Sequence, residues 1–243
     1  MGKVVLVTGG SRGIGAAVCR LAARDGWDVA IAYRTRADAA ERVAEDVRSL
    51  GRRVITIACD ITDPRSVCRM FDRTADELGY VEGLVSNAGV IHRAAPLVDI
   101  PTEEIERIVE TDLVAHIVCN REAVRRMARS RGGRGRVIVN ISSMVPELKG
   151  AGGFLPYAAA KAGIDVLTEG LGKEVAHEGI RVNGLRPGLI DTDMQADTGG
   201  PSASSASVRP SRSAGPAGPR RSRRPWSGSS PTKRATLPRP SST

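Results

Sequence analysis

The sequence predicts an α/β fold with a doubly wound parallel sheet, and three observations support this fold class. Short apolar runs, such as residues 4–7 and 137–139, are typical of strands buried on both faces. Helical stretches separate these runs along residues 1–198, as parallel βαβ crossovers require. A glycine-rich turn at residues 9–15 joins the first run to the first helical stretch. We therefore expect one domain over residues 1–198.

Strands and helices alternate in a regular order along this domain. The expected strands are residues 4–7, 29–33, 54–59, 83–85, 136–141 and 181–185. The expected helices are residues 16–25, 37–50, 64–78, 102–127 and 157–178. Right-handed crossovers would bring the strands into one parallel sheet.

Composition excludes several other protein classes. The chain has 243 residues, 41% of them hydrophobic, which is enough for one α/β domain with a substantial core. Its longest apolar runs are far below the roughly 20 residues of a membrane span, and Met1 leads into a strand without a signal-peptide pattern. The four cysteines and three histidines show no paired metal-ligand spacing. We expect a cytoplasmic protein with reduced thiols, no metal and no membrane partner.

The excess positive charge lies entirely in the last 45 residues. From Gly199 to Thr243 there are eight Arg, one Lys and no acidic residue, so residues 1–198 hold 27 basic and 27 acidic side chains. The same segment has twelve Ser and eight Pro, and we predict a disordered tail over 199–243. The alternative is an Arg-rich arm for nucleic acid, although Trp226 is its one aromatic residue.

Tyr157 and Lys161 form the most informative pair of side chains. Residues four apart lie on one helix face, so the phenol and the ammonium would project into one site, with Ser143 upstream. An adjacent ammonium favours the phenolate and lowers a Tyr pKa from about 10. That pattern suits a general acid acting on a carbonyl oxygen. Chance spacing on a solvated helix is the alternative explanation.

The glycine-rich turn predicts a dinucleotide site. It follows a strand and opens a helix, which is the context in which such a pattern binds a pyrophosphate. Glycines allow the tight turn and a close backbone approach, and the helix N-terminus attracts phosphates. The candidate residues are Gly9, Ser11, Arg12, Gly13, Ile14 and Gly15. An ordinary strand–helix turn is the alternative.

As a whole, residues 3–198 resemble the short-chain dehydrogenase/reductase family, a group with a Rossmann fold. The resemblance rests on several motifs in one order: Thr8, Gly9, Gly13 and Gly15; Asp60; Asn87-Ala88-Gly89; Ser143; Tyr157 and Lys161; Asn183; and Pro187-Gly188 with Thr192. Each motif alone is weak, whereas the ordered set is specific.

The resemblance implies a role for each matching residue. Ser143 would hydrogen-bond the substrate oxygen, Tyr157 would transfer the proton, and Lys161 would hold the nicotinamide ribose. The implied cofactor contacts are Asp60 and Ile61 at the adenine, Asn87, Ala88 and Gly89 at the floor, and Pro187, Gly188, Ile190 and Thr192 at the carboxamide. Alternatively, Asp60 is a simple cap and Ser143 belongs to a strand-end turn.

Cofactor choice depends on the end of the second strand. An acidic residue there would bind the ribose 2′-hydroxyl of NAD, whereas Arg accommodates a 2′-phosphate. This chain has Tyr33 followed by Arg34, and Arg12 adds a second cation. We therefore expect NADP(H), with NAD(H) less favoured. The alternative is that Arg34 and Arg36 are a solvated strand end.

The chain departs from the family pattern in two places. Asp112 stands where the family has a catalytic Asn; a carboxylate cannot donate the amide hydrogens and could pair with Lys161. Beyond Thr192, the family's last helix and strand are missing. A shifted reading frame joins the third base of each codon to the first two bases of the next codon. In that frame, the codons of residues 225–236 can encode Val-Trp-Leu-Leu-Ser-Asp-Glu-Ala-Ser-Tyr, a string that looks like the family. We predict a frameshift near Gly199–Gly200.

The expected protein is an NADP(H)-dependent oxidoreductase that interconverts a ketone and a secondary alcohol at Ser143, Tyr157, Lys161 and Asp112. By resemblance, the favoured substrate is a 3-oxoacyl thioester, a sugar or polyol is the alternative, and the intact family member would be a tetramer or dimer. A different class also remains: a non-catalytic dinucleotide-fold protein whose basic tail binds nucleic acid.

Overall fold

A six-stranded, all-parallel sheet forms the centre of the protein, and the computed structural model describes residues 2–188. The strand order is β3-β2-β1-β4-β5-β6. The strands are β1 (Lys3–Thr8), β2 (Trp27–Tyr33), β3 (Val54–Ala58), β4 (Val81–Ser86), β5 (Arg136–Ile141) and β6 (Ile180–Leu185). The predicted fold class is confirmed. The expectations about a disordered, nucleic-acid-binding or frameshifted tail and a missing last strand and helix concern residues outside those described.

Helices connect the strands in the predicted order. The long helices are α1 (Gly13–Arg24), α2 (Ala37–Ser49), α3 (Pro64–Leu78), α4 (Thr102–Val109), α5 (Ala115–Met127) and α6 (Leu155–Val175). Short 3₁₀ turns are η1 (Leu97–Asp99), η3 (Arg129–Arg131) and η4 (Ala176–Glu178). The start of α3 illustrates the local causes: Asp63 accepts from the N–H groups of Arg65 and Ser66, and Pro64 occupies the first turn.

The predicted helix over residues 102–127 is not uniform. A π-helical segment, η2 (Glu110–Val114), separates α4 from α5. A π turn adds a residue to one helical turn and so changes the direction of the side chains that follow, and such turns are frequent at functional sites. The fully buried Asp112 lies at the centre of this segment.

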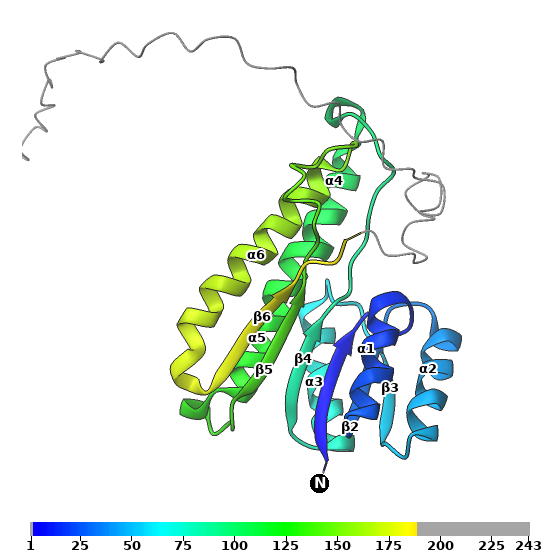
Figure 1. The fold of residues 1–243 in the computed structure, drawn as a ribbon, viewed down its shortest axis with the longest axis vertical. Helices are drawn as coiled ribbons and strands as arrows, with labels where there is room; N and C mark the ends of the chain where they lie inside the picture. The colour runs from blue at the N-terminus through cyan, green and yellow to red at the C-terminus, as the bar shows by residue number, and fades with distance from the viewer. Residues whose placement is uncertain (1, 189–243) are drawn as a thin grey trace, which may run out of the picture. The chain divides into compact units, whose positions relative to one another are not determined.

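Helices cover the two faces of the sheet unequally (Figure 1). On one face, buried side chains of α3, α5 and the end of α6 pack against the strands in the larger core cluster. On the other face, α1 and α2 pack against β1 and β2 in the second cluster. The strand order reverses between β1 and β4, and the carboxyl ends of strands at such a point are where open α/β sheets bind ligands.

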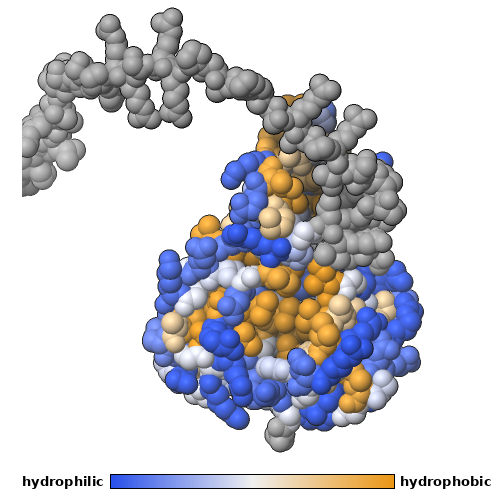
Figure 2. Space-filling view, viewed as in Figure 1, coloured by the Kyte–Doolittle hydropathy of each residue, from blue (hydrophilic) through white to orange (hydrophobic). Residues whose placement is uncertain are grey.

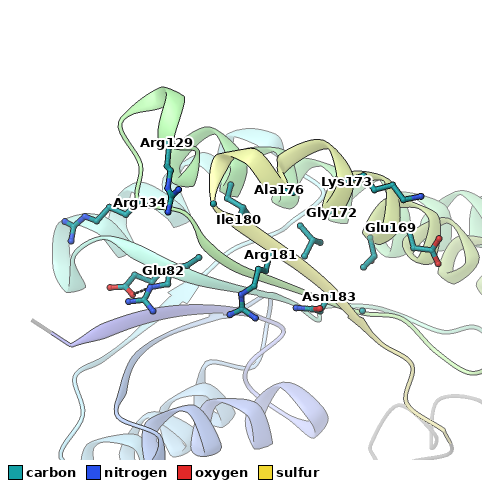
Figure 3. A pocket seen from close by; sticks show the side chains of 15 residues that line it. Glu82, Arg129, Arg134, Glu169, Gly172, Lys173, Ala176, Ile180, Arg181 and Asn183 are labelled. Carbon is teal, nitrogen blue, oxygen red and sulfur yellow. Dashed lines mark ion pairs between the residues drawn. The ribbon is translucent and has the colours of Figure 1, made fainter.

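The outer edge of β6 has no strand partner among residues 2–188. Leu185 on this strand is 51% exposed. A groove runs between β6 and α6, and Figure 3 shows the side chains of Arg129, Arg134, Lys173 and Arg181 around it. Figure 2 also shows apolar side chains gathered in the middle of one face of the molecule. A sheet edge and apolar surface are therefore uncovered in the part of the chain that the structure describes.

Candidate active site

The amino-terminal turns of α6 place Tyr157 and Lys161 together. The helix begins at Leu155, with Pro156 in its first turn. Tyr157 and Lys161 are only 7% and 3% exposed, and Lys161 Nζ lies 5.6 Å from the centroid of the Tyr157 ring. The spacing therefore corresponds to a buried phenol–ammonium pair and not to a solvated helix face.

Ser143 reaches the same place from the carboxyl end of β5. Its side chain is buried and close enough to Tyr157 to act on the pKa of that phenol. Ser143 Oγ also accepts a hydrogen bond of 3.1 Å from the N–H group of Val145. The structure thus brings Ser143, Tyr157 and Lys161 into one site, although Ser143 and the other two residues come from different elements.

The pKa of Tyr157 is raised, not lowered as the spacing of Tyr157 and Lys161 predicts. Burial is the main cause, because it disfavours the phenolate. The positive charge of Lys161 and the hydrogen bond from Ser143 act in the opposite direction, and the Asp112 carboxyl raises the pKa further. In the cofactor-free chain, Tyr157 is a phenol at neutral pH, which is the form that can donate a proton.

Contacts with the backbone hold Lys161 in place. Its Nζ donates to the carbonyl oxygen of Ile141 at 3.2 Å, at the end of β5. Ser142 Oγ donates to the Lys161 carbonyl oxygen at 3.1 Å. Lys161 Nζ also lies 3.7 Å from Asp112 Oδ1. Its ammonium is therefore fixed between the end of β5 and the π-helical segment.

Asp112 is buried beside Lys161. Asp112 Oδ1 accepts a hydrogen bond of 3.0 Å from the N–H group of Val90, whereas Oδ2 is buried without a hydrogen-bond partner among the described residues. Burial raises the pKa of this carboxyl, and the charge of Lys161 only partly offsets the effect. The structure places Asp112 against Lys161, as the sequence suggested.

The glycine turn is built so tightly that side chains would not fit. Gly9 has a φ of +65°, and a Cβ on Gly15 would lie 2.2 Å from the Gly9 carbonyl oxygen. The turn leads into α1 at Gly13, where Arg12 is the N-cap and makes no side-chain cap hydrogen bond. Ser11 and Ile14 are half-buried here. The first turn of α1 therefore has the backbone geometry of a phosphate site.

The segment after β4 fixes this turn. Asn87 Nδ2 donates to the carbonyl oxygens of Thr8 and Gly9, at 3.0 and 3.1 Å. Thr8 Oγ1 accepts from the N–H groups of Asn87 and Ala88. A Cβ on Gly89 would lie 2.5 Å from Asp112 Oδ1. Asn87, Ala88 and Gly89 therefore connect the glycine turn to the catalytic candidates.

Arg34 is the candidate cation at the carboxyl end of β2. It is exposed, directly after the half-buried Tyr33. Arg36, in contrast, hydrogen-bonds Asp38 through Nε and Nη2, each at 3.2 Å. Arg36 is therefore held by Asp38, whereas both a phosphate contact and a solvated strand end stay open for Arg34.

The candidate adenine residues follow β3. Asp60 Oδ1 accepts from the N–H and hydroxyl groups of Thr62, at 3.0 and 2.7 Å. Asp60 therefore caps its own turn, as the alternative expectation states, but it is exposed and close enough to Arg34 for that charge to act on it. Ile61 is buried in the larger core cluster.

The candidate residues after β6 are only partly described. The carbonyl oxygen of Pro187 accepts a hydrogen bond of 3.0 Å from the N–H group of Met144, next to Ser143. Gly188 is the last described residue. Ile190 and Thr192 lie outside the described residues.

The sequence analysis missed a buried polar row on η2 and α5. His116 Nε2 donates to the Ala88 carbonyl oxygen at 2.7 Å, and Nδ1 accepts from Ser86 Oγ at 3.0 Å. Burial, followed by the Lys161 charge, lowers the pKa of His116 to about 3, so its ring is neutral. Asp112, His116 and Asn120 recur every fourth residue, and this polar spacing along one helix face was the available signal.

The described residues fit a nicotinamide dinucleotide. The glycine turn, the start of α1 and Arg34 match the pyrophosphate and ribose of such a molecule, and Lys161 and Tyr157 lie beyond the end of β5. Residues 2–188 contain no group of three or more His, Cys, Asp or Glu placed to hold a metal ion. None of the described helices is long and apolar enough to cross a membrane.

Comparison with protein families agrees with this geometry. The family model for short chain dehydrogenases matches residues 3–201. The chain belongs to the short-chain dehydrogenase family. The match covers the glycine turn, the segment after β4 and the Ser143–Tyr157–Lys161 cluster, so these features lie within the family's shared region.

Individual family members are similar over most of their length. YgfF of Escherichia coli (strain K12), an uncharacterized oxidoreductase, is 41% identical over 198 residues, which are 82% of this chain and 80% of YgfF. A human 3-oxoacyl-[acyl-carrier-protein] reductase is 39% identical over 197 residues, or 81% of this chain and 79% of the human protein. A crystal structure of a short chain dehydrogenase from Burkholderia cenocepacia J2315 in complex with NADP has a TM-score of 0.73 and 40% identity, covering 79% of this chain and 76% of that one.

Proposed function

We propose that this family member is an NADP(H)-dependent oxidoreductase that interconverts a ketone and a secondary alcohol. The observation that carries the proposal is the buried cluster in which Tyr157 contacts Ser143 and lies beside Lys161. This cluster lies beyond the carboxyl end of β5 and the glycine turn beyond the carboxyl end of β1, so both lie at the same edge of the parallel sheet.

Each residue of the cluster has a distinct role in the proposed reduction. Ser143 donates a hydrogen bond to the substrate carbonyl oxygen, and Tyr157 transfers its phenolic proton to that oxygen. Lys161, held by Ile141, stabilises the negative charge that Tyr157 then carries. A nicotinamide cofactor bound at the glycine turn would supply the hydride for the carbonyl carbon. One hydride and one proton thus convert the ketone into the alcohol, and solvent restores the proton of Tyr157.

The preference for NADP(H) is part of the proposal. Arg34 follows the end of β2, where the ribose of a dinucleotide lies in this fold, and a guanidinium binds a phosphate well. The relative from Burkholderia cenocepacia was crystallised with NADP. Both observations favour a 2′-phosphate over a free 2′-hydroxyl.

A 3-oxoacyl thioester is the proposed substrate class. The similarity to a human 3-oxoacyl-[acyl-carrier-protein] reductase supports this choice. The test is oxidation of NADPH by the full-length product of the resequenced gene, with a 3-oxoacyl thioester, simple ketones and sugars compared at equal concentration. The highest kcat/KM should belong to the thioester. Faster turnover of a sugar would replace the substrate class and keep the reaction type.

The protein is also proposed to form a homo-oligomer, whether a dimer or a tetramer. Apolar side chains on neighbouring helical segments are exposed: Val166 on α6 is 73% exposed, and Val114 and Ile117 are about half exposed. Exposed apolar surface of this kind is typical of interfaces. Light scattering of the same full-length product should give a mass of two or four chains. A monomer would show that this surface is not an interface.

A further inference from the structure

The carboxyl group of Asp112 has one satisfied oxygen and one unsatisfied oxygen. Oδ1 accepts from Val90, while Oδ2 is buried without a hydrogen-bond partner among residues 2–188. The residue is 0% exposed. An ionised carboxylate needs hydrogen-bond donors or counter-charges at both oxygens, so this environment does not suit a carboxylate.

The charges around Asp112 do not supply the missing partner. Lys161 of α6 is 3.7 Å from Oδ1, beyond the length of a charge-assisted hydrogen bond, and its Nζ donates to Ile141 instead. The charge of Arg107 on α4 acts on Asp112, and the Arg107 side chain hydrogen-bonds Glu104 and the Ile91 carbonyl oxygen. His116 of α5 is neutral, and Tyr157 of α6 is a phenol.

Protonation removes the costlier part of this imbalance. The carbonyl oxygen still accepts from Val90, and the hydroxyl, although it also has no partner among the described residues, carries no charge for burial to penalise. In shape and charge the protonated carboxyl then resembles the amide of Asn. Burial of the Asp112 carboxyl acts in the same direction on its pKa, raising it.

We propose that Asp112 is protonated in the resting protein and is a positioning residue that acts through Lys161. The neutral acid leaves the whole positive charge of Lys161 for Tyr157, whereas a carboxylate 3.7 Å away would neutralise it. Loss of the Asp112 proton at higher pH therefore weakens stabilisation of the tyrosinate. This effect on turnover rests on the proposed function, but the protonation state can be measured without any activity.

The first test compares the stability of the full-length chain with that of Asp112→Asn across pH. A carboxyl whose pKa is raised in the folded chain contributes stability that is fully present below its pKa in the unfolded chain, about 3.9. That stability is lost as pH rises through its pKa in the folded chain. The wild type should therefore become less stable relative to Asp112→Asn as pH rises. A wild type that becomes relatively more stable would mean an ionised pair with Lys161 and would overturn the proposal. Asp76→Asn, at an exposed position of α3, should show no such trend.

The second test is infrared spectroscopy of the same chain with carbon-13-labelled aspartate. The wild type and Asp76→Asn should show the carbonyl band of an aspartic acid at neutral pH, and Asp112→Asn should lack it. Absence of the band from the wild type overturns the proposal, and if Asp112→Asn does not fold, a pH titration of the wild-type band decides alone.

Kinetics separate this inference from the proposed function. In ketone reduction, the rate of the wild type should fall on the alkaline side, by up to about tenfold per pH unit, and the pH profile of Asp112→Asn should lack this decline, whatever its maximal rate. An aspartic acid band in a protein without reductase activity would refute the proposed function alone. If the wild type and Asp112→Asn are both active and their rates fall equally at alkaline pH, the action of Asp112 through Lys161 would be refuted.

Discussion

Burial dominates the chemistry of Tyr157 at the scale of single residues. The spacing of Tyr157 and Lys161 correctly predicts that they lie together and that the Lys161 charge acts to lower the Tyr157 pKa, but burial outweighs this effect, so the pKa is raised in the described chain. Desolvation depends on side chains from other segments, among them Ile108 and Phe154, which pack in the same small cluster. Local spacing does not reveal such contacts.

The proton-donor role of Tyr157 predicts a specific loss in Tyr157→Phe. The variant keeps the ring and the packing but lacks the hydroxyl, so ketone reduction should slow by about 10²–10⁴-fold. Its NADPH affinity, measured by fluorescence titration, should stay within a few-fold of the wild type. A near-normal rate in this variant would contradict the role assigned to Tyr157.

The cofactor preference predicts different effects for two neighbouring arginines. Arg34→Ala should raise the KM for NADPH, by about tenfold or more if one charge-assisted contact of 1.5–3 kcal/mol is lost, and leave the KM for NADH unchanged. Arg36→Ala is the matched control, because Arg36 hydrogen-bonds Asp38. Steady-state kinetics with both cofactors measure the split. Equal changes for NADPH and NADH in Arg34→Ala would exclude a 2′-phosphate contact.

At the scale of elements, apolar patterns predicted the six strands that the structure describes. The errors concern the ends of strands and one interruption of a helix, which depend on contacts far along the chain. The expected strand at residues 83–85 is longer, Val81–Ser86, because Val81 pairs with Val4 of β1 and Ser86 pairs with Asn140 of β5. The π-helical interruption at Glu110–Val114 was not predicted, since its residues have ordinary helical composition. Tertiary contacts of Asp112 distinguish it from a continuous helix.

Substitution by alanine should have different effects at two glycines in different elements: a loss of cofactor affinity at Gly15 and a gain of stability at Gly170. In Gly15→Ala the new methyl group would meet the Gly9 carbonyl oxygen at 2.2 Å, so the turn must shift, and NADPH affinity should fall at least tenfold. In Gly170→Ala, within α6, nothing lies within 4 Å, and stability should rise by about 0.5–1 kcal/mol. Cofactor titration and thermal melting of both variants measure these effects. Unchanged affinity in Gly15→Ala would contradict the close approach of backbone and cofactor.

At the scale of the whole molecule, the outer edge of β6, which has no strand partner among residues 2–188, predicts poor solubility of the 243-residue chain. An exposed sheet edge with adjacent apolar surface is an aggregation hazard, and domains are stable by only about 5–15 kcal/mol. We expect the 243-residue chain, with its tail as written, to be poorly soluble or inactive and to bind NADPH weakly at best. Sedimentation and thermal melting test this. A soluble chain that melts cooperatively would show that the edge needs no further cover.

The origin of the tail is a separate proposal. We propose a change of reading frame near Gly199–Gly200, and the end of the family match at residue 201 supports it. Resequencing the gene should reveal a reading frame that encodes the family-like string in place of residues 225–236. An unchanged frame through residue 243 would contradict the proposal.

Deuterium transfer tests the proposed reaction most directly. The full-length product of the resequenced gene is mixed with NADPH deuterated at C4 of the nicotinamide and with a 3-oxoacyl thioester, and the alcohol is analysed by mass spectrometry and NMR. The account predicts one deuterium on the carbon that carried the ketone and a hydroxyl proton derived from solvent. Two results would contradict the account. One is an alcohol that carries no deuterium on that carbon, whichever of the two C4 hydrogens is labelled. The other is that no tested ketone is converted into an alcohol.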